Sequence, residues 1–145
     1  MSGNRVAVIL LLVSMPAHAG DWAVQVNAVS WHSEPGYNEA NTGLGLQYSA
    51  IDGRAVKRYV GGTLINSMGD RTWYAGVNYG YRALDTAVTA DIGVVAELIT
   101  YPSSGKSVLP GLLPVVTLGV ARAALNFVYI PRIADKTAEA VLIQL

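Results

Sequence analysis

The chain contains no cysteine, which excludes a disulfide framework that would compensate for its small size of 145 residues. Charge is scarce and balanced, since ten basic and ten acidic residues give a formal net charge of zero. We therefore expect no nucleic-acid partner, because neutralising phosphates requires a basic face. Hydrophobic residues nevertheless make up 52% of the chain and charged residues only 14%. This balance is unusual for a secreted soluble domain and typical of a small barrel surrounded by lipid.

The first nineteen residues have the pattern of a secretory signal peptide. Arg5 supplies the positive segment, residues 6–13 the apolar segment, and Ala17-His18-Ala19 a small-x-small cleavage site. The apolar segment is too short to span a membrane as a helix, and no later segment supplies the roughly 20 apolar residues that a spanning helix needs. We predict a signal peptide at 1–19 and a single domain at 20–145.

The rest of the chain alternates between two unlike faces. In residues 88–98 one face carries Val88, Ala90, Ile92, Val94, Ala96 and Leu98, and the other carries Thr89, Asp91, Gly93, Val95 and Glu97. A period of two is typical of a β-strand between two environments. A continuous apolar face opposite a face of carboxylates and glycines is the pattern of a membrane barrel.

Turn residues divide the chain into eight predicted strands. They lie at 22–32, 44–51, 56–67, 71–84, 87–101, 112–121, 124–131 and 138–145. An even number of strands joined by short turns allows closure, which removes the open edges that lipid does not tolerate. The predicted fold is all-β, an eight-stranded antiparallel transmembrane β-barrel in the outer membrane of a Gram-negative bacterium. The alternative is a secreted β-sandwich or lipocalin-like barrel, whose exposed face should carry more charge.

Strand counting places the loops. With the amino terminus on the periplasmic side, segments 33–43, 68–70, 102–111 and 132–137 face the exterior. The inward phase is predicted to contain six glycines, which leave room for a guest such as an acyl chain. Packing against bulky or charged side chains is an equally good interpretation of that phase. The glycines are Gly45, Gly61, Gly76, Gly80, Gly93 and Gly119, and the bulky side chains are Tyr59, Tyr74, Arg82 and Glu97.

Two residues with catalytic side chains fall at the exterior rim. His32 ends the first predicted strand and Ser67 ends the third. An imidazole serves as a general base, and a serine hydroxyl as a nucleophile or oxyanion donor. Serine at a loop edge is more often simple turn chemistry. The carboxylates Glu34, Glu39 and Asp70 lie on the same side and are interpreted as solvated loop charge rather than a cation site, so we expect no metal and no cofactor.

Several segments, in order and spacing, resemble the outer-membrane lipid A palmitoyltransferase family over residues 29–131. Ser30-Trp31-His32 is similar to the family's Thr-Trp-His segment, and Asn66-Ser67 lies at its catalytic Asp-Ser pair. The other matching segments are Tyr37-Asn38-Glu39, Gly43-Leu44-Gly45-Leu46, Ala75-Gly76, Leu112-Leu113-Pro114 and Tyr129-Ile130-Pro131.

The resemblance implies an acyltransferase that moves a palmitoyl chain from a phospholipid donor to a lipid A acceptor, acting as a monomer in the membrane. It implies catalytic roles for His32, Asn66 and Ser67 and an acyl pocket at Gly76 and Asn78. It also implies a lateral gate at Pro114 and Pro131, because proline donates no ladder hydrogen bond. Alternatively, each proline merely ends its strand.

The sequence departs from the family at positions that matter for activity. Asn66 replaces a carboxylate, and Asn78 replaces the glycine at the pocket floor, where a larger side chain should shorten or block the accepted chain. Asn27 and Asn41 stand where the family has two prolines beside a second wall opening. A second hypothesis is therefore a non-catalytic barrel of the same lineage, with a structural, adhesive or receptor-blocking role at the cell surface.

Overall fold

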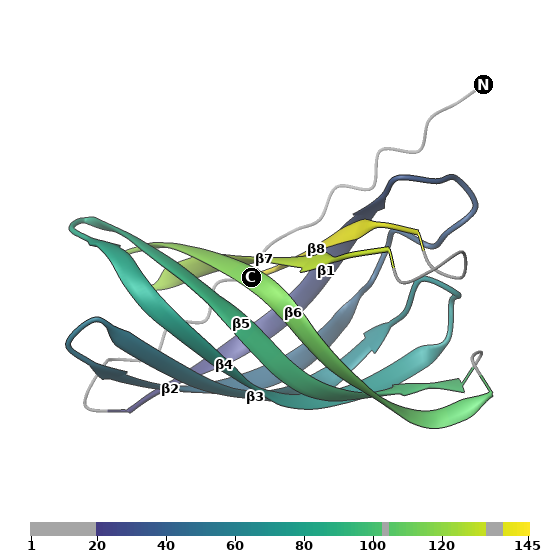
Figure 1. Cartoon of the computed structure of the whole chain (residues 1–145), viewed down its shortest axis with the longest axis horizontal. Helices are drawn as coiled ribbons and strands as arrows, with labels where there is room; N and C mark the ends of the chain where they lie inside the picture. The colour runs from purple at the N-terminus through teal and green to yellow at the C-terminus, as the bar shows by residue number, and fades with distance from the viewer. Residues whose placement is uncertain (1–19, 103–104, 133–137) are drawn as a thin grey trace.

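The computed structural model describes residues 20–102, 105–132 and 138–145, and these form an all-β, eight-stranded antiparallel closed barrel (Figure 1). The predicted signal peptide lies outside the described residues. The strands are β1 (Asp21–His32), β2 (Gly43–Asp52), β3 (Ala55–Ile65), β4 (Arg71–Asp85), β5 (Val88–Tyr101), β6 (Lys106–Val120), β7 (Ala123–Ile130) and β8 (Ala140–Gln144). Within the described part of the chain, no helix is long and apolar enough to cross a membrane.

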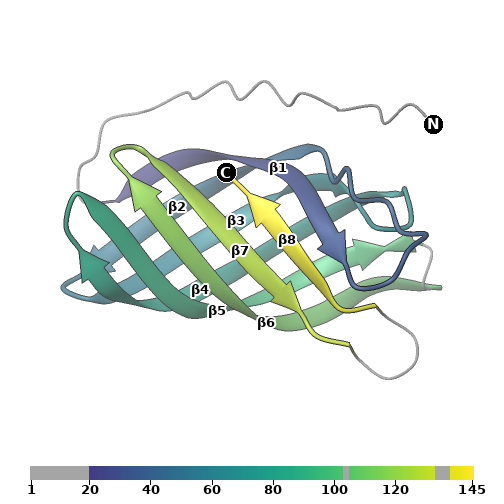
Figure 2. The same cartoon turned by 90° about the horizontal axis from the view of Figure 1, so that it is seen from above.

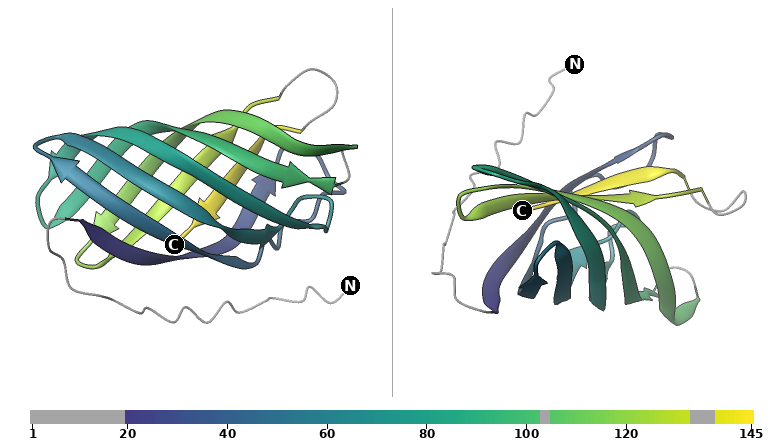
Figure 3. Two further views of the ribbon diagram at one scale, coloured as in Figure 1. Left: turned by 90° about the horizontal axis from the view of Figure 1, so that it is seen from below. Right: turned by 60° about the vertical axis from the view of Figure 1, so that its left-hand side comes forward.

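Each strand pairs with its neighbours in the chain, and β1 pairs with β8 to close the barrel. Figure 2 shows the strands strongly tilted against the long axis, as closure of a sheet requires. We call the end at which β1 finishes the His32 end (right in Figure 1) and the opposite one the Gly53 end. Figure 3 shows the same two ends from below and along an oblique view.

The predicted alternation is confirmed in β5. Val88, Ile92 and Leu98 are exposed, whereas Asp91 and Val95 are buried. The Asp52-Gly53 turn is also as predicted: Gly53 has a φ of 57°, a left-handed conformation that glycine adopts without steric cost.

The start of β6 was predicted wrongly. This strand begins at Lys106 rather than at residue 112, so most of the predicted loop 102–111 is strand. Pro110 argued against an early start, because proline is rare inside sheets. In the structure Pro110 pairs with Leu98 of β5, and Pro114 pairs with Val94.

Two side-chain directions in β3 were also predicted wrongly. Val56, Arg58 and Leu64 are buried, so the even-numbered residues of this strand face inward. Gly62 therefore faces the interior instead of Gly61, and Tyr59 lies on the outer surface with 44% of its surface exposed. The adjacent Gly61-Gly62 pair left the phase of this strand open at the sequence level.

Asp91 joins two arginines near the Gly53 end. Its carboxylate binds Arg58 on β3 and accepts a hydrogen bond from Nε of Arg82 on β4 at 2.9 Å. Arg58 and Asp91 are both buried. Three strands are therefore tied together inside the barrel by one charged group.

Candidate functional site

The His32 end brings the two predicted catalytic side chains into contact. His32 is the last residue of β1, on its inward phase, and Ser67 lies in the turn that follows β3. The imidazole Nε2 and the hydroxyl Oγ are 2.9 Å apart, within hydrogen-bonding distance. An unprotonated Nε2 in this position accepts the proton of the serine hydroxyl, which is the geometry of base-activated nucleophiles.

The plane of the His32 ring is fixed by Tyr37, from the loop between β1 and β2. The two rings stack with centroids 4.8 Å apart and an interplanar angle of 16°. The backbone N–H of His32 donates to the carboxylate of Glu39 in the same loop at 3.4 Å. The ring's other nitrogen, Nδ1, is buried and has no hydrogen-bond partner among the described residues. The imidazole is therefore held by stacking and by Ser67 rather than by a carboxylate.

Asn66 is adjacent to Ser67 but engages other groups. Its side-chain oxygen accepts the backbone N–H groups of Met68 (2.9 Å) and Asp70 (3.0 Å), and its amide donates to the Thr72 hydroxyl at 3.0 Å. These contacts stabilise the turn between β3 and β4, a common role of asparagine. Asn66 thus positions the backbone that carries Ser67 and makes no hydrogen bond with His32.

The loop carboxylates do not gather into a cluster. Glu34 forms an ion pair with Arg132, whereas the Glu39 carboxylate accepts a hydrogen bond from the backbone N–H of His32. Within the described residues there is no group of histidine, cysteine, aspartate or glutamate side chains able to hold a metal ion.

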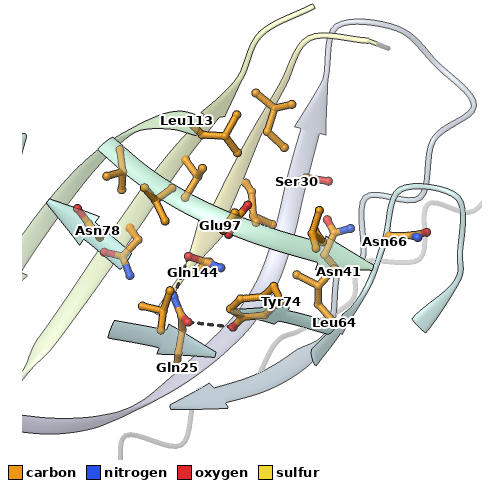
Figure 4. Close-up of a pocket in the computed structure, with 18 of the residues that line it drawn as sticks. Gln25, Ser30, Asn41, Leu64, Asn66, Tyr74, Asn78, Glu97, Leu113 and Gln144 are labelled. Carbon is orange, nitrogen blue, oxygen red and sulfur yellow. Dashed lines mark hydrogen bonds between the residues drawn. The ribbon is translucent and has the colours of Figure 1, made fainter. Parts of the chain in front are cut away.

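A cavity runs inward from Ser67. It is narrow, with a volume of about 100 Å³. Figure 4 shows Asn41 and Asn66 toward one end of it, Glu97 near its middle and Asn78 toward the other end. Its aliphatic lining comes from five strands and comprises Val60, Leu64, Val95, Ile99, Leu113, Val115, Val128, Ile130 and Leu142.

The two predicted acyl-pocket residues differ in their positions. Asn78 lines the cavity, is buried, and leaves its side-chain oxygen without a hydrogen-bond partner. Gly76 faces inward opposite Glu97 and does not itself line the cavity. A Cβ at Gly76 would lie 2.5 Å from the Ala96 carbonyl oxygen, so the close approach of β4 and β5 requires glycine here.

Pro114 and Pro131 lie on either side of an interrupted ladder. The pairs between β6 and β7 run from Val120–Ala123 to Val115–Val128 and stop there. Pro114 is the next residue of β6 beyond the last pair, and Pro131 directly follows the end of β7. Pro114 does not end its strand, whereas Pro131 does. In the described part of the chain, β6 residues 106–114 pair with β5 alone.

Asn27 and Asn41, which stand where the resembled family has a second pair of prolines, both make hydrogen bonds. Asn41 donates to the Ile65 carbonyl at 2.9 Å, and the flanking loop backbone binds both sides, Ser30 to Glu39 and Ile65 to Thr42. Asn27 belongs to a closed ring of four side chains. Tyr74 donates to Gln25 (2.9 Å), Gln25 to Gln144 (2.8 Å), Gln144 to Asn27 (2.7 Å) and Asn27 to Tyr74 (3.0 Å).

Sequence reasoning did not identify Tyr37, Tyr101 or this ring as parts of the site. Tyr101 lies within hydrogen-bonding reach of Ser67 and lines the cavity. The alternation places Gln25, Asn27 and Tyr74 inward, but which of them meet depends on strand stagger. For Tyr37 no local pattern would have revealed that its loop folds back over His32.

Comparison with known proteins adds no relative: neither protein-family models nor curated protein sequences match this chain.

Proposed function

We propose that this chain is an outer-membrane barrel that transfers an acyl chain from a phospholipid to lipid A. The observation that carries the proposal is the 2.9 Å contact between His32 Nε2 and Ser67 Oγ at the cavity lined by aliphatic side chains. A general base beside a hydroxyl is the arrangement that acyl transfer needs, and an aliphatic cavity beside it is where the transferred chain would lie.

The outer surface supports a place in lipid. At the His32 end, Trp31 is 62% exposed and Trp73 is 60% exposed. Toward the Gly53 end, Trp22 is 58% exposed. Between these aromatic residues the outward phase carries exposed aliphatic side chains such as Leu46 and Ile92. Two aromatic belts around an apolar band are typical of barrels in the outer membrane. In water so large an apolar surface would promote aggregation.

The reaction needs only groups that the proposal names. His32 accepts the proton of the Ser67 hydroxyl while its oxygen attacks the ester carbon of the phospholipid. The bond to the glycerol oxygen breaks, and the lysophospholipid leaves with the proton that His32 returns. His32 then accepts the proton of a lipid A hydroxyl, whose oxygen attacks the acyl-serine; the bond to Ser67 breaks, and the Ser67 oxygen receives the proton back from His32. The interrupted ladder beside Pro114 is the place in the wall where a lipid tail would enter, because residues 106–114 have no ladder to break on the β7 side.

Lipid A mass spectrometry tests the function. Cells that express the protein should yield lipid A that is heavier by one acyl group, and the His32→Ala and Ser67→Ala variants should not. Ser33→Ala, in the exposed loop, is the matched control and should retain the modification. Heat-modifiable gel migration verifies that each variant is a folded barrel. A mass gain that persists in both variants would refute the site.

The second candidate is a non-catalytic barrel with a surface role. Two observations favour it. No described residue bonds His32 Nδ1, and Asn66, which stands where the resembled family has a carboxylate, bonds the backbone of its own turn. Unmodified lipid A from cells that contain well-folded protein would support this candidate and overturn the enzyme.

A further inference from the structure

Some of the groups that line the cavity are polar, and a purely hydrocarbon occupant would make no hydrogen bond to them. Polar side chains lie among its aliphatic ones, including the Asn78 amide and the Glu97 carboxyl. Several have partners, such as the ring of Gln25, Asn27, Tyr74 and Gln144 and the pair of Thr117 and Asn126 at 2.7 Å. Among the described residues, three buried side-chain atoms of the lining have none: Ser30 Oγ, Asn41 Oδ1 and, at the far end of the cavity from Asn41, Asn78 Oδ1 (Figure 4). Buried polar groups are normally satisfied, so an unpartnered one indicates a site for water or a ligand.

Asn78 presents an unsatisfied acceptor to the cavity. It lies on the inward phase of β4, lines the cavity and is 5% exposed. Its side-chain oxygen has no hydrogen-bond partner among the described residues. Its register partner Arg58 on β3 binds Asp91 and is not part of the cavity lining.

The space around Glu97 also indicates an occupant. Its two register partners are glycines, Gly76 on β4 and Gly111 on β6, so no side chain covers the carboxyl from either neighbouring strand. Among the described residues it has no ion-pair partner, because Arg58 and Arg82 are bound to Asp91. A chain that passes this carboxyl on its way to Asn78 would have to tolerate a polar wall.

The distance from the catalytic pair fits a chain that ends at Asn78. Asn66 bonds Thr72 at the start of β4, and Asn78 lies six positions further along the same strand. At ~3.4 Å per residue this places Asn78 roughly 20 Å along the strand from the rim.

We propose that the cavity is specific for an acyl chain that carries a hydroxyl group at the position reaching Asn78. A hydroxyl donates its proton to the Asn78 oxygen and so satisfies it, which a methyl end does not. This inference rests on the proposed function for the orientation of the chain, with its ester at Ser67.

Native mass spectrometry of the barrel in neutral detergent tests the inference. The probes are two lysophosphatidylcholines of equal chain length, one ending in a methyl and one in a hydroxyl group, compared at several lengths. The hydroxyl-ended lipid should bind about 3- to 10-fold more tightly at the best length, the contribution of one net hydrogen bond. Because the two lipids partition differently into micelles, the preference is expressed relative to that of the Asn78→Leu variant.

Asn78→Leu should lose the preference or reverse it, since leucine is similar in size and accepts no hydrogen bond. Thr117→Val is the matched control, because it too removes a buried polar group. The Thr117 hydroxyl already bonds Asn126, so this variant should keep the preference. If Asn78→Leu and the unsubstituted protein show the same ratio, the proposal is wrong, and water serves Asn78 instead. A stronger preference for an ammonium-ended chain would also overturn it and would point to Glu97.

These outcomes are separate from the test of acyl transfer. Unmodified lipid A together with a clear hydroxyl preference would leave the cavity specificity intact in a non-catalytic barrel. Modified lipid A without any preference would leave the enzyme and remove the specificity.

Discussion

The Asn66 side-chain amide donates a hydrogen bond to the hydroxyl oxygen of Thr72 at 3.0 Å. Thr72 is fully buried, and its own hydroxyl proton is donated to the Thr100 carbonyl at 2.9 Å. Asn66 therefore connects the turn that carries Ser67 to β4 and, through Thr72, to β5. Asn66 is the residue that most weakens the resemblance to a catalytic Asp-Ser pair, and in this barrel its role is structural.

Asn66→Asp should lower the free energy of unfolding by about 1 kcal/mol. An aspartate oxygen would face the Thr72 oxygen with no proton between them, unless Thr72 gave up its bond to Thr100. Urea unfolding of the barrel in detergent measures the change, with Ser33→Ala as the exposed control. Equal or greater stability of Asn66→Asp would show that the amide proton is not needed.

Tyr37→Ala should slow acyl transfer roughly 2- to 10-fold, whereas Tyr37→Phe should retain it. The stacked ring holds the imidazole plane, and aromatic pairs contribute about 0.5–1.5 kcal/mol beyond their buried area. Phenylalanine keeps the ring and loses only the hydroxyl. A readout that needs no enzyme is the ¹⁵N chemical shift of the His32 ring, which should move in Tyr37→Ala. Identical effects of both substitutions would contradict a role for stacking.

Asp91→Asn should destabilise the barrel by about 3–5 kcal/mol, because Arg58 and Arg82 would then be left inside without a carboxylate. Asp85→Asn is the matched control. Its carboxylate is also near Arg82, at 3.7 Å, but its side chain is 60% exposed, so the loss should be at most about 1 kcal/mol. Urea unfolding midpoints of the two variants compare them directly. Similar losses in both would mean that burial of Asp91 adds nothing.

Gly76→Ala should destabilise the barrel by about 1–3 kcal/mol through overpacking. The new methyl would meet the backbone oxygen of Ala96 at 2.5 Å, and backbone cannot rotate away as a side chain can. Gly111→Ala, on the other side of Glu97, would place its methyl 3.5 Å from the Glu97 Cγ, an ordinary contact. That variant should stay within about 0.5 kcal/mol of the unsubstituted protein. The reverse order of stabilities would rule out steric exclusion at Gly76.

Much of the architecture could be predicted because strand alternation is a local property. Each predicted strand overlaps an observed one, and the topology correctly placed His32 and Ser67 at one end. The failures came where the local pattern was weak. The Gly61-Gly62 pair left the phase of β3 open, and Pro110 made the first half of β6 read as loop, although an edge facing an interrupted ladder tolerates proline.

The sequence by itself determined the strand order, the apolar outer face and, outside β3, the residues that point inward, because a period of two needs only neighbouring residues to be read. Only the tertiary structure decided which inward side chains meet. The stagger of β1, β4 and β8 selects Asn27, Tyr74, Gln25 and Gln144 as a closed ring, and a folded-back loop selects Tyr37 as the partner of His32. For the same reason, the Asn66 side chain bonds groups of its own turn and not His32. Hydrogen-bond partners are chosen by distances across strands and loops, and no sequence period records those distances.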